Sequence, residues 1–267
     1  MNELTFGYSP CPNDTFMFNA IAGQQVNVPK YRIKTILHDV ETLNDLAFTA
    51  TLDITKLSFY AWLKVKQNYR LLNSGAAMGF GCGPVLIARP ECRKADVNQS
   101  RIVLPGQWTT AHLLFRLWAP EAEHRLFTPY DNIFQSLSSG KADFGVIIHE
   151  SRFTFTSEGF VEVVDLGRWW EERTGFPIPL GGIAVREELG GPMIRSIDAA
   201  VKKSIQTANA FPKKTFAYIR QHAREMDEAV LQSHIQTFVN EYSLELPPEG
   251  IRAIATLEKM AAEAGLL

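Results

Sequence analysis

His149 closes a short apolar segment, Phe144–Ile148, and is the first candidate for chemistry. The run is typical of a strand buried on both faces in a parallel sheet. Open α/β sheets bind their ligands at the carboxyl ends of such strands. A neutral imidazole there can accept a proton near pH 7, because its ordinary pKa is about 6.5. The alternative is a histidine that only satisfies loop carbonyl groups, and the local sequence leaves both interpretations open.

Two adjacent threonines, Thr109 and Thr110, follow a strand-like run that ends at Leu104 and a Pro-Gly turn. They open a predicted helix, whose first N–H groups and hydroxyls can bind a carboxylate or a phosphate. Plain N-capping needs only one of them and is the commoner role of either taken singly, although the two roles can coexist. His112, one turn further on, is expected to be a packing or surface residue.

Two more polar segments lie in the first quarter of the chain. Lys56 and Ser58 end a strand-like run and can hold an anionic or hydroxyl-rich ligand, although most lysines lie on solvated faces. Asn13 and Asp14 follow the first predicted strand, and we expect one of them to cap the next helix. These segments also stand at the carboxyl ends of predicted strands, where an α/β cleft would lie.

Composition and motifs narrow the classes of function. Lys and Arg number 27 against 29 Asp and Glu, a net charge of −2, so no global field attracts nucleic acid or an anionic membrane. Phosphate-loop, dinucleotide-binding and nucleophile-elbow motifs are absent from the sequence, and Phe153 stands where a zinc motif begun at His149–Glu150 needs its second histidine. Nucleotide hydrolysis, classical dehydrogenation and zinc proteolysis are therefore not expected.

The cysteines and the hydropathy indicate the compartment. Cys11, Cys82 and Cys92 are an odd number whose spacing fits neither a disulfide framework nor a zinc site. The first residues do not form a secretory leader, and no later run approaches the roughly 20 apolar residues that span a bilayer. We expect reduced thiols and a cytoplasmic location.

Strand-like and helical segments alternate through the first two thirds of the chain, which is typical of an α/β protein with largely parallel sheets. The expected strands are Leu4–Tyr8, Arg32–Leu37, Leu52–Leu57, Arg101–Leu104, His124–Phe127, Phe144–Ile148 and Phe160–Leu166. The expected helices are Thr15–Ala22, Val40–Phe48, Thr110–Trp118 and Asp131–Ser139, followed by Pro192–Ala208, Pro212–Ala223, Asp227–Val239 and Pro247–Ala264.

Two glycine- and proline-containing segments, residues 71–89 and 177–186, interrupt this alternation and are expected to cross between lobes. They predict a first lobe made of residues 1–89 and 178–267, which carries the terminal helices, and a second lobe made of residues 90–177. Two short connections between two α/β lobes form a cleft that can close around a small molecule.

Several long strings together carry a family resemblance: SPCPNDTFMF, DVETLNDLA, TKLSF, SGAAMGFGCGP, TTA, FGVIIHESRFTF and DLGRWWEERTGFPIPLGGI. With the helical tail, they resemble the 1,4-dihydroxy-6-naphthoate synthase family of the futalosine route to menaquinone. The resemblance implies a two-lobed, periplasmic-binding-protein-like type II fold that works in the cytoplasm as an enzyme, without a metal or organic cofactor.

The resemblance also implies roles for particular residues. The histidine of the IIHE string, His149 here, would be the proton acceptor. The KLS and TT strings would contact the substrate, and they place that role on Lys56, Leu57, Ser58, Thr109 and Thr110.

The implied substrate is cyclic dehypoxanthine futalosine, which joins a carboxylated bicyclic ring system to a sugar-derived portion. Removal of a proton from a sugar hydroxyl, or from the carbon next to a carbonyl, would start a retro-aldol-like cleavage that releases the aromatic product. Two alternatives stay open: a cytoplasmic two-lobed solute-binding protein, and the related chorismate-dehydrating enzyme of the same pathway. The TKLS and IIHESRF strings favour the synthase, and the oligomeric state stays open.

Overall fold

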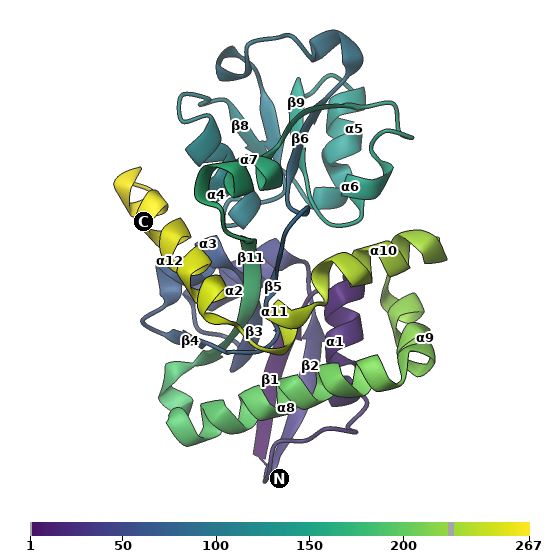
Figure 1. Cartoon of the computed structure of the whole chain (residues 1–267), viewed down its shortest axis with the longest axis vertical. Coiled ribbons are helices and arrows are strands. Elements are labelled where there is room, and N and C mark those ends of the chain that lie inside the picture. Colours follow the sequence, from purple (N-terminus) through teal and green to yellow (C-terminus); the bar gives the residue numbers. More distant parts are fainter. Residues whose placement is uncertain (1, 224–226) are drawn as a thin grey trace.

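Two β-sheets, one in each lobe, organise the computed structural model, which describes residues 2–223 and 227–267. The lobes lie one above the other along the longest axis, and the chain passes between them twice (Figure 1). The expected two-lobed α/β architecture is thus confirmed.

The sheet of the first lobe has the strand order β2-β1-β3-β11-β4, with β5 also paired to β11. Its strands are β1 (Asn2–Tyr8), β2 (Tyr31–Leu37), β3 (Ile54–Ser58), β4 (Tyr69–Leu71), β5 (Ala77–Gly79) and β11 (Ile178–Arg186). The first three run parallel, whereas β11 is antiparallel to β3, β4 and β5. The carboxyl ends of β1 and β3 therefore meet at one edge, which faces the second lobe.

The sheet of the second lobe has the order β10-β6-β9-β7-β8. Its strands are β6 (Val85–Ala88), β7 (Ile102–Leu104), β8 (Arg125–Phe127), β9 (Phe144–Ile147) and β10 (Val161–Asp165). β7 is parallel to β8 and β9, and β6 is antiparallel to β9 and β10. The end of β9 points back toward the first lobe.

The crossing strands depart from the sequence expectation in two ways. Both sheets are mixed. β6 enters the second lobe from the first and runs antiparallel to β9, and β11 enters the first lobe from the second and runs antiparallel to β3. The first crossing also lies earlier than residue 89: β6 is an inner, fully buried strand of the second sheet, so the chain changes lobe between Gly79 and Val85.

Helices cover both sheets (Figure 1). Those of the first lobe are α1 (Pro12–Ala22), α2 (Val40–Phe48), α3 (Phe59–Val65), α8 (Gly191–Ala210), α9 (Pro212–His222), α10 (Glu228–Phe238), α11 (Glu241–Leu244) and α12 (Pro248–Glu263). Those of the second lobe are α4 (Thr110–Trp118), α5 (Ile133–Ser138), α6 (Ser151–Thr154) and α7 (Leu166–Thr174). Short 3-10 turns occur at Pro90–Cys92, Val97–Gln99, Tyr130–Asn132 and Glu187–Leu189.

Aspartates begin several of these helices. Asp39 accepts hydrogen bonds from the second and third N–H groups of α2, and Asp165 does the same for α7. Such a cap satisfies N–H groups that have no partner inside the helix and stabilises it by about 1 kcal/mol. At its other end α7 stops at Gly175, whose φ of 71° suits glycine.

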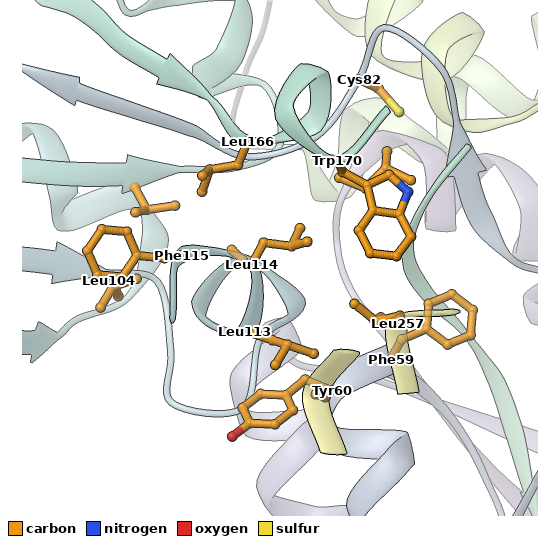
Figure 2. Close-up of a cluster of buried hydrophobic side chains, with 14 of the residues drawn as sticks. Phe59, Tyr60, Cys82, Leu104, Leu113, Leu114, Phe115, Leu166, Trp170 and Leu257 are labelled. Atoms are coloured by element: carbon orange, nitrogen blue, oxygen red, sulfur yellow. The ribbon is translucent and has the colours of Figure 1, made fainter. Parts of the chain in front are cut away.

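The largest hydrophobic cluster spans both lobes rather than filling either one. Figure 2 shows Leu113 and Leu114 of α4 beside Tyr60 of α3 and Leu257 of α12, with Trp170 of α7 in the same cluster. All five side chains are at most 5% exposed. The cluster therefore holds the second lobe against the first beside the sheet edges that carry the polar residues.

Candidate active site

A cavity between the lobes collects the polar residues that the sequence singles out. Lys56, Leu57, Ser58, Thr109, Thr110 and His149 all line it. They come from the end of β3, the start of α4 and the loop after β9. The wall also includes Ser9, Asn13, Asp14 and His234, and apolar side chains of Val40, Ile148, Leu180 and Phe238.

His149 presents an unpartnered nitrogen beside this cavity. Its Nε2 is shielded from solvent and has no hydrogen-bond partner in the described chain. The ring packs edge-on against Tyr130, with 4.9 Å between centroids. Burial lowers the pKa of His149 to about 4; Lys56 adds to this and Asp14 opposes it. The imidazole is therefore neutral at pH 7 and able to accept a proton.

The backbone at His149 is left-handed, with a φ of 57°. Residues other than glycine rarely adopt this conformation, and histidine, asparagine and aspartate do so several times more often than the rest. The chain turns sharply here from β9 toward α6, and this turn directs the ring to the cavity. The choice of residue at position 149 is thus restricted by backbone geometry as well as by chemistry.

Lys56 is held by a buried ion pair. Its Nζ lies 3.1 Å from Oδ1 of Asp14, and the two side chains are 7% and 1% exposed. Asp14 also accepts hydrogen bonds from the N–H and hydroxyl of Ser9, at 3.1 and 2.8 Å, and from Nδ2 of Asn13, at 3.0 Å. The carboxylate of Asp14 therefore already balances the charge of the Lys56 ammonium. The ion pair fixes the side chains of the site, and Lys56 is not a free cation for a ligand.

Asn13 and Asp14 do not cap a helix, which corrects the expectation from sequence. The N-cap of α1 is Cys11, which makes no side-chain capping bond, and Pro12 takes the first helical position. Both polar residues thus lie within the first turn, where their side chains turn into the cavity wall. Asp14 serves as the anionic centre of that wall.

Ser58 and Leu57 contribute differently from Lys56. The hydroxyl and N–H of Ser58 are both bonded to the side chain of Asn44, at 3.1 and 3.0 Å. The side chain of Leu57 belongs to a hydrophobic cluster with Val65 and Tyr69, so we infer that Leu57 meets the cavity through its backbone. Alternation along β3 explains why neighbouring residues face opposite sides.

Thr109 and Thr110 begin α4, as the sequence predicts. The hydroxyl of Thr109 caps the helix by accepting from the N–H of His112 at 3.2 Å, and it donates to the carbonyl of Gly106 at 3.0 Å. Within the described chain, the N–H groups of Thr110 and Ala111 have no hydrogen-bond partner, and both residues line the cavity. The amino end of α4 therefore offers two donors and a positive dipole end to an anion.

Polar contacts join the lobes beside this helix end, among them a hydrogen bond from the N–H of Tyr60 to the hydroxyl of Thr110 at 3.3 Å. The hydroxyl of Thr110 donates to the carbonyl of Leu180 at 2.7 Å, and Glu41 accepts from the N–H of Trp108 at 2.9 Å. Burial raises the pKa of the Glu41 carboxyl. Gly106 permits this approach, because a Cβ there would lie 2.5 Å or less from the carboxyl group of Glu41.

His234 is the residue of this site that sequence analysis misses. It lies on α10, is 0% exposed, and its ring centroid is 6.1 Å from that of His149. Its Nε2 is 2.9 Å from Oδ1 of Asn13, whereas its Nδ1 has no partner in the described chain. The local sequence offers only a histidine on an amphipathic helix, 221 residues from Asn13.

Residues 2–223 and 227–267 contain neither a metal-binding cluster nor a membrane-spanning helix. No three His, Cys, Asp or Glu side chains in these ranges are grouped so that they could hold a metal ion. No helix in the same ranges has the length and apolar character needed to cross a membrane.

Stability is expected to fall on mild acidification because burial lowers the pKa of three histidines. His112 is 5% exposed and His234 0%. Burial lowers the pKa of His112 and of His149 to about 4, and that of His234 well below its ordinary value. The unfolded chain binds protons near pH 6.5 and the folded chain does not, so each histidine reduces the free energy of unfolding by up to about 1.4 kcal/mol per pH unit below that point.

Urea unfolding at about pH 7 and about pH 5 measures this loss. The His112→Gln variant should show a shallower decline, because one of the three contributions is removed. A free energy of unfolding that stays level over this interval would contradict the assignment of neutral, buried imidazoles.

Comparison with known proteins places this site in a family. A family model described as menaquinone biosynthesis matches residues 4–263. A curated 1,4-dihydroxy-6-naphthoate synthase of Thermus thermophilus is 43% identical over 270 residues, which cover 100% of this chain and 96% of the relative. A synthase of the same name from Streptomyces coelicolor is 37% identical over 272 residues, covering 100% and 95%.

Solved structures agree on the fold. A protein of Archaeoglobus fulgidus matches with a TM-score of 0.93 and 31% identity, covering 99% of this chain and 98% of its own. The alkanesulfonate-binding protein of Xanthomonas axonopodis pv. citri, bound to MOPS, matches with a TM-score of 0.72 at 14% identity, covering 100% and 94%. The second likeness bears on the fold alone, which is that of periplasmic binding proteins.

Proposed function

The chain belongs to the menaquinone biosynthesis family, and we propose that it is the lyase that converts cyclic dehypoxanthine futalosine into 1,4-dihydroxy-6-naphthoate. The observation that carries this proposal is the match of the whole chain to two curated 1,4-dihydroxy-6-naphthoate synthases at 43% and 37% identity. The cavity supports it, because it combines an unpartnered imidazole, an anion-binding helix end and an apolar wall.

In this proposal His149 is the general base. Its neutral imidazole takes a proton from a sugar hydroxyl or from the carbon next to a carbonyl. In the hydroxyl case, the released O–H electron pair forms a carbonyl on the departing three-carbon fragment as the carbon–carbon bond breaks. The pair from that bond passes to the ring ketone as an enolate, which tautomerises to the aromatic product. Aromatisation supplies much of the driving force.

The carboxylate of the bicyclic ring system binds at the amino end of α4. The two unpartnered N–H groups there and the helix dipole favour an anion. Lys56 is the less suitable anchor, because Asp14 already neutralises it at 3.1 Å. Lys56 instead orients the acidic centre of the wall, while burial keeps the imidazole of His149 neutral.

Thr109→Val is expected to reduce stability more than substrate affinity. The hydroxyl of Thr109 is already used in two hydrogen bonds, one of which caps α4. Loss of an N-cap costs about 1 kcal/mol, whereas the backbone donors at the helix end remain. Thermal unfolding and KM measured on the same preparations test this. A KM that rises tenfold with an unchanged melting temperature would show that the hydroxyl contacts the substrate directly.

The activity itself is tested by incubating the purified protein with cyclic dehypoxanthine futalosine and following dihydroxynaphthoate by absorbance and mass. Steady product formation over many turnovers supports the lyase. Tight binding without turnover would favour the solute-binding alternative. Neither binding nor turnover would mean that the substrate is wrong, and chorismate would be assayed next.

We also propose that the enzyme works in the cytoplasm. The support is that Cys11, Cys82 and Cys92 are all free, the first two of them buried. Free thiols are usual in reducing compartments and uncommon in secreted proteins. Burial also raises the pKa of Cys82 to about 12, so this thiol stays protonated and unreactive at neutral pH.

A further inference from the structure

A second histidine, His234, faces the same cavity as His149 from the opposite lobe. It is carried by α10 of the first lobe, whereas His149 follows β9 of the second. Both residues line the cavity, and each has one ring nitrogen that is buried and without a partner in the described chain. A buried polar atom without a partner costs free energy, and a ligand atom can supply the missing bond.

A chain of hydrogen bonds fixes which nitrogen of His234 carries the proton. Lys56 and Nδ2 of Asn13 both donate to Oδ1 of Asp14, at 3.1 and 3.0 Å. Asn13 must therefore turn its carbonyl oxygen toward His234, where Nε2 lies 2.9 Å away. A carbonyl oxygen can only accept, so Nε2 is the protonated nitrogen.

The remaining nitrogen of His234 is then an acceptor. Burial and the nearby positive charge of Lys56 keep the ring neutral, because both lower its pKa. A neutral imidazole protonated on Nε2 has a lone pair on Nδ1. That lone pair has no donor in the described chain, so it suits a ligand hydroxyl and disfavours a carboxylate, which would bring a second lone pair against it.

We propose that Nδ1 of His234 accepts a hydrogen bond from a hydroxyl of the sugar-derived portion of the substrate, and so positions that portion opposite His149. This inference rests on the proposed function, because it takes its ligand from there. It makes His234 a positioning and specificity residue. Asp14 orients Asn13, and Asn13 fixes the proton of His234 on Nε2. Both imidazoles, one from each lobe, then lie at the wall against which the sugar-derived portion binds.

Two substitutions separate this role from a structural one. In His234→Gln the amide nitrogen can occupy the place of Nε2 and keep the bond to Asn13, but the acceptor at the place of Nδ1 is lost. In His234→Asn the shorter amide can place its oxygen near the position of Nδ1, but it gives up the bond to Asn13. Substrate contact therefore predicts that the asparagine variant is the more active, whereas a structural role predicts the reverse order.

The expected result is a KM about tenfold higher for His234→Gln with kcat nearly unchanged, and a KM within about threefold of the parent for His234→Asn. His112→Gln is the matched control, because it removes a buried imidazole that does not line the cavity, and its KM should stay unchanged. If the parent turns over the substrate and His234→Gln has the same KM, the inference about His234 is overturned. The proposed lyase function is not affected by that result.

A spectroscopic test does not depend on turnover. In protein labelled with 15N-histidine, the unprotonated nitrogen of His234 should be Nδ1 in the ligand-free state. Its resonance should move on adding cyclic dehypoxanthine futalosine to the His149→Asn variant. A proton on Nδ1, or a resonance that stays in place when the substrate binds, would overturn the inference. An unmodified protein that neither binds nor converts the substrate would refute the proposed function itself.

Discussion

His149→Asn is expected to lower kcat by about 10²–10⁴-fold while the substrate still binds. That range is the usual loss when a general base is removed, and it corresponds to about 3–5 kcal/mol in the activation barrier. The parent residue offers an unpartnered Nε2 beside the cavity and is neutral at pH 7, because burial lowers its pKa to about 4. An asparagine amide cannot take up the proton, so the chemical step should slow while the cavity keeps its other contacts.

Asparagine is the suitable replacement because of the backbone. Position 149 has a φ of 57°, which asparagine tolerates better than alanine or glutamine. A loss of activity in His149→Asn therefore reports on the imidazole and not on a strained turn, and its thermal unfolding should match the parent closely. Calorimetry would measure substrate affinity and a stopped assay would measure turnover. Full turnover by this variant would remove His149 as the base.

The pH dependence of the parent gives a second measure of the same group. Because the pKa of His149 is lowered to about 4, the acidic limb of kcat/KM should lie well below the ordinary histidine value of about 6.5. An acidic limb near pH 6.5 would place the base in a wetter environment than the cavity provides.

The fold was largely predictable because strands and helices alternate with distinct periodicities. β1, β2 and β3 and the helices between them follow from the apolar pattern of each segment alone. The antiparallel direction of β6 and β11 does not follow from the apolar pattern, because strand direction depends on the lobe from which the chain arrives. A buried strand such as Val85–Ala88 looks the same in either sheet, so the sequence misplaces the crossing by a few residues.

The site was predictable where polar residues follow strands. His149 follows β9, Lys56 lies two residues before the end of β3 and Thr109 caps α4, and the geometry of an α/β sheet brings such ends to one edge. A capping role was predicted for Asn13 or Asp14 because capping is local, whereas Lys56, the partner of Asp14, is 42 residues away. No local sequence signal marks His234, because the hydrogen bond that identifies its role is to Asn13, near the other end of the chain.

Asp14→Asn is expected to reduce the free energy of unfolding by about 3–5 kcal/mol, the usual cost of removing one partner of a buried ion pair. Lys56 would be left in a position where it is 7% exposed, with its anionic partner gone. The new amide would also place an N–H group among donors, because Asp14 now accepts from Lys56, Asn13 and both polar groups of Ser9. Urea unfolding at neutral pH measures the loss.

A double-mutant cycle shows whether the unpaired charge is the cause. Lys56→Met removes the ammonium and leaves Asp14 with its three remaining donors, so this variant should lose less stability than Asp14→Asn. Adding Lys56→Met to Asp14→Asn should then recover part of the stability, because no isolated charge stays buried. Strictly additive losses would contradict an energetic coupling between the two residues. The KM for the substrate should stay raised when stability recovers, because the double variant lacks the carboxylate that orients Asn13 toward His234.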